Sequence, residues 1–205
     1  MNFIILASVL LLGLLVFVSN SRTKKTDADT VAHFWERERE ANLTRRKPLD
    51  DLNYISLPLD TFPMTLLKED EQVAECIETI RTLSAEKIVN FTGFTNTDLK
   101  LRYGAPNINL LTAYDQNYTL LVRTLQKWAD LLYQNGYPQE ARTLLEFAVS
   151  TGSDVSGTYR LLCRIYRESG CPEKIDGLSV IADSLQSASK GTIARILAES
   201  SRSDG

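Results

Sequence analysis

The sequence predicts a mostly α-helical protein, with one transmembrane helix at the N-terminus and an α-helical domain after it. Three observations predict this fold class. Residues 3–18 are almost entirely apolar. From residue 68 onward, apolar side chains recur at the three- and four-residue spacing of amphipathic helices. The glycine and proline of Gly136-x-Pro138 recur 34 residues later as Gly170-x-Pro172, which indicates repeated helical hairpins. We divide the chain into a transmembrane anchor (1–20), a basic juxtamembrane helix with a proline-containing linker (21–67), an N-terminal helical region (68–108) and the helical repeats (109–205).

The apolar stretch Phe3–Val18 reads FIILASVLLLGLLVFV. With two flanking residues at each end it would rise about 30 Å as a helix, which matches a bilayer core. A cleaved signal peptide would need a basic side chain before this stretch and an Ala-x-Ala pattern after it, so we favour an uncleaved anchor. Arg22, Lys24 and Lys25 follow directly. The positive-inside rule therefore predicts an N-terminus outside and a cytoplasmic C-terminal domain. An exported protein with a cleaved or uncleaved signal is an alternative.

Charge is segregated along the chain. Arg22–Lys47 holds eight basic and five acidic residues, a net charge of +3. The remainder, from Pro48 onward, holds 15 basic and 21 acidic residues, a net charge of −6. An acidic domain argues against nucleic acid as a partner, and the basic excess lies where a membrane surface would be.

The three cysteines are sparse and form no Cys-x-x-Cys pattern. They therefore suit neither a disulfide framework nor a zinc site, and they fit a reducing compartment. We expect Cys76, Cys163 and Cys171 to be small, partly buried side chains, with Cys171 the most exposed.

Between the anchor and the repeats the pattern changes several times. Asp29–Ala41 is a helix candidate whose Phe34-Trp35 pair could lie at headgroup level, although we favour a solvated helix with Glu–Arg pairs. Pro48–Leu67 holds three prolines among apolar residues, which predicts an extended segment lying against the domain.

Three further elements lead up to the repeats. Lys68–Leu83 has the spacing of an amphipathic helix. We expect a second short helix over 84–91 with Ser84 as its cap, and a loop over Phe94–Asn107.

The helical signal is strongest from Leu110. One apolar face runs as far as Leu132, and Asn135-Gly136 then ends the helix. Pro138 opens the next helix, which ends near Thr151-Gly152. The pattern recurs around Gly170 and Pro172, and six of 29 aligned positions are identical between 122–150 and 156–184. A last helix is predicted over Thr192–Ser200, which would cap the array.

These units resemble the tetratricopeptide repeat family. The family's helix-A and helix-B positions match the following residues of the first unit: Leu125, Trp128, Ala129, Leu132, Gly136, Ala141, Leu145 and Ala148. The second unit matches through Tyr159, Leu162, Cys163, Tyr166, Gly170 and Ala182. It departs at Ile175, where the family has a small residue at the helix crossing, and at Ser179, where the family has a large one. The resemblance implies about two tetratricopeptide-like (TPR-like) hairpins plus a capping helix. The whole pattern is also similar to uncharacterised single-span proteins of Gram-positive bacteria. This similarity brings no known activity with it.

Catalytic patterns are lacking in the sequence. The only histidine, His33, precedes the domain, which excludes a Ser-His-Asp or Cys-His arrangement inside it. No phosphate-binding glycine loop and no zinc-ligand spacing occurs. We therefore expect no enzyme activity, no cofactor and no metal.

One basic stripe is the candidate binding surface. Arg160, Arg164 and Arg167 lie at i, i+4 and i+7 of the second helix A. The resemblance implies a concave groove formed by these arginines together with the equivalent residues Arg123, Gln126, Asp130 and Tyr133. Arginine side chains suit carboxylates, so an acidic peptide or a free C-terminus is the expected ligand, and a merely solvated face is the alternative.

The expected function is that of a membrane-anchored cytoplasmic adaptor or scaffold, bound to lipid through residues 3–18. The alternative is a structural or assembly subunit of a membrane complex or of a homo-oligomer.

Overall fold

The computed structural model describes residues 31–202, and these are mostly helical with no β-strand among them. The transmembrane helix predicted over 3–18 lies outside this range. Within the described range, no helix has both the length and the apolar character needed to cross a membrane. The described chain forms two compact units, one from 31–47 with 95–108 and the other from 48–94 with 109–202. The predicted region 68–108 is therefore shared between the two units.

The first unit is held together by polar contacts between a helix over 31–43 and α3 (Asn96–Tyr103). Arg37 forms an ion pair with Asp98 at 2.5 Å. Glu38 accepts from Lys100 and, at 2.5 Å, from the Thr97 hydroxyl. Hydrogen bonds to Lys100 and Thr97 lower the pKa of the Glu38 carboxyl.

The loop that we predicted over Phe94–Asn107 is wrong, because this segment contains α3 and a short 3-10 helix, Ala105–Asn107. The signal for α3 is local. The Thr95 side chain accepts from the Asp98 backbone N–H, and the Asp98 carboxylate accepts from the Thr95 backbone N–H. This reciprocal capping pairs donors that the first turn of a helix leaves unpaired. The helix was not predicted because the amphipathic pattern of the segment is weak.

The second unit begins with the linker predicted as extended and lying against the domain. The packing against the domain is confirmed, whereas the extended conformation is confirmed only in part, because turns and bends occupy 50–52 and most of 59–67. Residues 48–67 form turns without a helix, and several of their apolar side chains pack against the core. Phe62 is buried, with its ring edge-to-face against Trp128 and Phe147 at centroid distances of 6.3 and 5.2 Å. Apolar residues between prolines thus cover the core without regular structure.

Helix α2 (Glu71–Leu83) confirms the predicted amphipathic helix, shortened at its start. Asp70 is the cap, and its carboxylate accepts from the backbone N–H of Gln72 and Val73 at 2.9 and 3.0 Å. The second helix predicted over 84–91 is wrong. Ser84 instead ends α2, and the chain runs on without a helix so that the adjacent Ile88 and Val89 are both buried. The Ile88 carbonyl accepts from the Ile55 N–H at 2.9 Å, which ties this segment to the linker.

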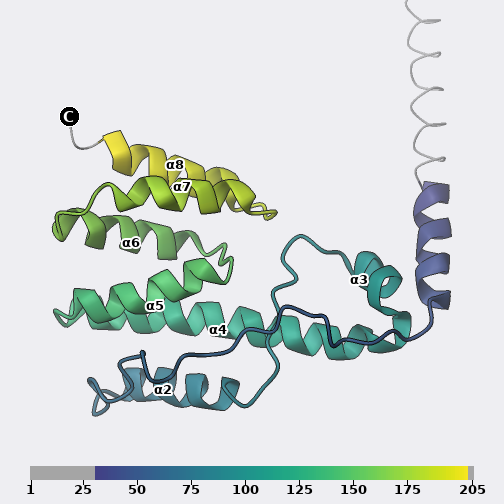
Figure 1. The fold of residues 1–205 in the computed structure, drawn as a ribbon, viewed down its shortest axis with the longest axis horizontal. Coiled ribbons are helices and arrows are strands. Elements are labelled where there is room, and N and C mark those ends of the chain that lie inside the picture. The colour runs from purple at the N-terminus through teal and green to yellow at the C-terminus, as the bar shows by residue number, and fades with distance from the viewer. Residues whose placement is uncertain (1–30, 203–205) are drawn as a thin grey trace, which may run out of the picture. The chain divides into compact units, whose positions relative to one another are not determined.

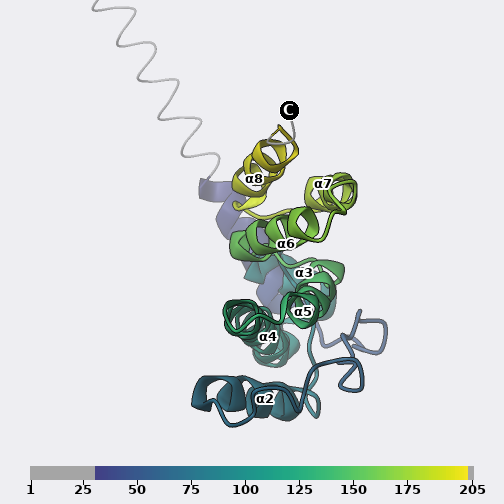
Figure 2. The ribbon, with the colours of Figure 1, turned by 90° about the vertical axis from the view of Figure 1, so that its left-hand side faces the viewer.

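The rest of the second unit is a stack of helices: α4 (Ile108–Gln134), α5 (Pro138–Ser150), α6 (Ser156–Glu168), α7 (Lys174–Ser184) and α8 (Lys190–Arg202) (Figure 1). These positions confirm the predicted helical hairpins and the last helix. Seen end-on, α4, α6 and α8 form one layer, and α5 and α7 form the other (Figure 2). The layers alternate along the chain, so each connecting turn crosses from one layer to the other.

Two of these turns depend on glycine. Gly136 and Gly170 have φ angles of +84° and +68°, a region that other L-residues rarely occupy. Each lies just before the proline that precedes or opens the next helix. The 34-residue period therefore corresponds to a repeated hairpin in space.

Ile175, which stands where the repeat family has a small residue, is accommodated in the core between the layers. Ala141 and Ile175 occupy equivalent places, and both are buried. The cysteines also follow the prediction: all three are free thiols, Cys76 and Cys163 are buried, and Cys171 is partly exposed. Burial raises the pKa of the Cys76 and Cys163 thiols.

Candidate basic groove

Helix α6 separates apolar from basic side chains with little overlap. One side buries an apolar set that joins the core: Tyr159, Leu161, Leu162, Cys163, Ile165 and Tyr166. Arg160, Arg164 and Arg167 are exposed on the other side. A period of 3.6 residues puts positions i, i+4 and i+7 on one face, so the stripe expected from the sequence exists as a surface.

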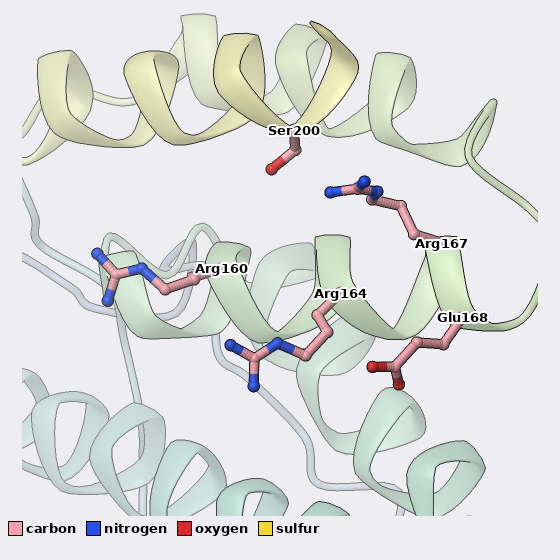
Figure 3. Close-up of a pocket in the computed structure, with 5 residues that line it drawn as sticks. All are labelled: Arg160, Arg164, Arg167, Glu168 and Ser200. Atoms are coloured by element: carbon pink, nitrogen blue, oxygen red, sulfur yellow. The ribbon is translucent and has the colours of Figure 1, made fainter. Parts of the chain in front are cut away.

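The three arginines line one surface pocket of about 580 Å³, together with Glu168 and Ser200. Figure 3 shows that Arg167 extends on the α8 side of α6, toward Ser200, whereas Arg164 and Glu168 extend toward the opposite side. We refer to this pocket, with its five lining residues, as the basic pocket. It presents three guanidinium groups against one carboxylate, a net positive lining on an acidic domain.

That carboxylate is already engaged within the protein. The Tyr133 hydroxyl of α4 donates to Glu168, with oxygen–oxygen distances of 2.7 and 2.8 Å. This hydrogen bond raises the pKa of Tyr133. The Arg164 guanidinium lies 5.9 Å from the centroid of the Tyr133 ring. Tyr133 therefore holds Glu168 at the edge of the pocket and supports Arg164 through a cation–π contact.

The remaining expected groove residues lie on α4 and line a second pocket. Arg123, Gln126 and Asp130 surround a volume of about 420 Å³. The Gln126 side chain donates to Asp130 at 2.9 Å and accepts from the Thr158 hydroxyl of α6 at 2.8 Å. Since both polar ends of Gln126 are engaged, this side chain joins α4 to α6.

The structure thus distributes six of the seven expected residues over two pockets. Arg160, Arg164 and Arg167 share the basic pocket. Arg123, Gln126 and Asp130 share the other, and Tyr133 links α4 to the basic pocket through Glu168. All of them project from α4 or α6, the layer that also contains α8 (Figure 2). This is the layer in which the resemblance to tetratricopeptide repeats implies a groove.

Two kinds of lining residue escaped the sequence reasoning. Ser200 enters the basic pocket from α8, and the register of a third unit would have placed that helix beside α6. Gln72 enters the second pocket from α2, for which no sequence signal exists, because the packing of α2 against α4 is tertiary.

The basic pocket is lined by polar and charged side chains. Within residues 31–202, no group of three or more histidine, cysteine or acidic side chains is placed to hold a metal ion. His33 has a highly exposed side chain, 4.0 Å from the Glu36 carboxylate one turn further along the same helix. In this pocket the guanidinium groups and the Ser200 hydroxyl can donate hydrogen bonds to an anion, whereas the Glu168 carboxylate can only accept them.

Comparison of the chain with known protein families, with curated proteins and with solved structures finds no match.

Proposed function

We propose that this protein is a membrane-anchored, cytoplasmic interaction module that binds an acidic segment of a partner protein. The observation that carries the proposal is the basic pocket, which Arg160, Arg164 and Arg167 line together, with the Ser200 hydroxyl on the side toward which Arg167 extends (Figure 3). Each guanidinium offers a planar fork of donors that matches a carboxylate, so three of them select a segment with several acidic groups or a free C-terminus.

The helical stack supports this proposal because it holds the pocket rigidly. Side chains that flank the arginines on α6 are buried in the core, so the helix cannot rotate without exposing apolar surface. Gln126 and Tyr133 fix the neighbouring helix through their bonds to Thr158 and Glu168. The backbone of the pocket is therefore ordered before binding, and the entropic cost of binding falls on the exposed arginine side chains.

The anchor and the orientation rest on the sequence, on the apolar stretch Phe3–Val18 followed by Arg22, Lys24 and Lys25. Tethering raises the effective concentration of the module at the membrane. The resemblance to tetratricopeptide repeats supports the same kind of role, since such stacks present extended binding surfaces.

A photocrosslinking amino acid in place of Ser200, in the full-length protein, tests the pocket. We expect capture of one main partner species, and we expect it to be lost when Arg160, Arg164 and Arg167 are all changed to Glu. A matched control changes Lys68, Arg81 and Arg195 to Glu, which alters the net charge equally at exposed positions outside the pocket. Equal capture by both triple variants would refute the groove, provided that circular dichroism shows unchanged helix content.

A second test uses peptides on the same proteins. A peptide with a free acidic C-terminus should compete with the crosslinked partner, and the same peptide with an amidated C-terminus and neutral side chains should not. If the neutral peptide competes equally, then carboxylate recognition is not the basis of binding.

Cys171 provides a test of orientation. It is partly exposed while Cys76 and Cys163 are buried, so an impermeant maleimide should report on Cys171 alone. We expect labelling only after the cell membrane is opened, and no labelling in Cys171→Ser. Labelling of intact cells would support the exported alternative instead.

An assembly subunit is the second candidate function, and one observation favours it. Helix α7 exposes two adjacent apolar side chains, with Val180 74% and Ile181 36% exposed. Sedimentation of the protein in detergent would show a stable oligomer if this face is an interface between copies, and Val180→Glu would dissociate that oligomer.

A further inference from the structure

The helical residues 31–43 expose large apolar side chains. Phe34 is 55% exposed and Trp35 60% exposed, and their rings meet edge-to-face at a centroid distance of 5.4 Å. Val31, one turn before them, is also exposed. These three residues recur at i, i+3 and i+4, so they form one apolar patch on the helix surface, here called the aromatic patch.

The contacts of this helix with α3 do not explain the patch. They are made further along the helix by Arg37 and Glu38, which pair with Asp98 and Lys100. The aromatic patch lies one turn closer to the N-terminus. Arg37 and Glu38 contact α3, and the exposed Phe34 and Trp35 lie in the preceding turn. The helix therefore presents a second surface that α3 does not cover.

We propose that Phe34 and Trp35 insert into the interfacial layer of an anionic lipid bilayer. This inference rests on the proposed membrane anchor and adds a second, separate lipid contact to it. Aromatic rings, tryptophan above all, favour the level of the lipid headgroups, where an apolar body and a polar N–H are both accommodated.

The distance along the chain fits a bilayer as the occupant. Twelve residues, 19–30, separate the apolar stretch from Val31. Such a linker spans at most about 40 Å when extended and about 18 Å as a helix, so the patch stays within reach of the surface on which the anchor ends. A tether this short gives a lipid contact a high effective concentration.

The charge around the patch fits an anionic surface. Residues 22–47 carry a net charge of +3, with basic residues on both sides of the aromatic pair. Arg45, Arg46 and Lys47 follow the helix and are exposed. Basic residues next to an interfacial aromatic patch add attraction to anionic headgroups, which a binding surface for another protein would not require.

Fluorescence of the full-length protein in vesicles tests this inference, because the chain has only two tryptophans. Trp128 is fully buried in the helical stack, so lipid-borne quenchers reach Trp35 alone. The vesicles contain phosphatidylglycerol in phosphatidylcholine, with bromine placed either near the head or near the end of the acyl chain.

We expect bromine near the headgroup to quench at least about twofold more than bromine near the chain end, as interfacial depth requires. In Trp35→Phe, the remaining emission from Trp128 should not be quenched. Vesicles without phosphatidylglycerol should give weaker quenching of Trp35.

Three results would overturn the inference. If the protein floats with the vesicles while Trp35 stays unquenched, then the anchor holds and the aromatic patch does not touch lipid. If Trp35 becomes shielded in detergent as protein concentration rises, then a second copy covers the patch. If quenching is equal without phosphatidylglycerol, then the assignment to an anionic surface is wrong. Failure of the protein to float at all would remove the proposed anchor together with this inference.

Discussion

Replacing Ile175 by Ala should strongly destabilise the helical stack. Ile175 is 1% exposed, in the first turn of α7, at the place where the preceding hairpin has Ala141. The substitution removes three buried carbon atoms, and at about 0.8 kcal/mol for each the transfer cost is about 2.4 kcal/mol. A residual cavity adds to this cost, while the higher helix propensity of alanine returns about 0.4 kcal/mol. We expect the free energy of unfolding to fall by about 3 kcal/mol, a large part of the 5–15 kcal/mol typical of a domain.

The matched control is Val180→Ala on the same helix. Val180 is among the most exposed apolar side chains of the stack, so its truncation should change the free energy of unfolding by less than about 0.5 kcal/mol. Urea unfolding of a chain that lacks residues 1–20 measures both, with the slope against urea expected to stay constant. A loss below about 1 kcal/mol for Ile175→Ala, or equal losses for both variants, would refute the packing argument. It would then follow that the second hairpin tolerates a small residue at its crossing, as the tetratricopeptide pattern has it.

Three further predictions concern the backbone, the tyrosines and the thiols. Gly104→Ala should lower the free energy of unfolding by at least about 2 kcal/mol, because φ is +95° and the new Cβ would lie 2.2 Å from the Arg45 carbonyl oxygen. Gly136→Ala, which has open space around the new Cβ, should lower it by only about 1 kcal/mol. Thermal unfolding of both variants measures the difference. Burial raises the pKa of Tyr118 and Tyr159 to about 12, so stability that is complete below pH 10 should be lost as the pH rises toward 12. This prediction would be contradicted if phenolate absorbance showed Tyr118 and Tyr159 titrating together with the partly exposed tyrosines. Finally, a thiol reagent should modify Cys171 quickly, and it should modify Cys76 and Cys163 only on unfolding; fast reaction of all three would show that the core is open.

The helical repeats were predictable because their signals are local. Gly136 and Gly170 end helices at positive φ, prolines follow, and apolar residues recur with the helical period between these points. The arginine stripe was predictable for the same reason, since the spacing of Arg160, Arg164 and Arg167 places them on one face of any helix. Neither inference needed knowledge of which helices touch.

The misassigned segments show where local signals fail. Ser84 has the chemistry of a helix cap, yet it ends α2, because burial of both Ile88 and Val89 favours a non-helical chain pinned to Ile55. Conversely, α3 forms on a capping box despite a weak apolar pattern, and it is held by side chains about 60 residues earlier in the chain.

By itself, the sequence determined the helix-rich class, the hairpin period and the basic face of α6, since each follows from a spacing within one segment. Only the tertiary structure decided what that face encloses. It brought Ser200 into the pocket that the arginines line, joined Tyr133 to Glu168, and placed Arg123, Gln126 and Asp130 at a different pocket. These relations join residues from different helices, and they depend on how side chains fill the space between layers, which spacing along the chain does not encode.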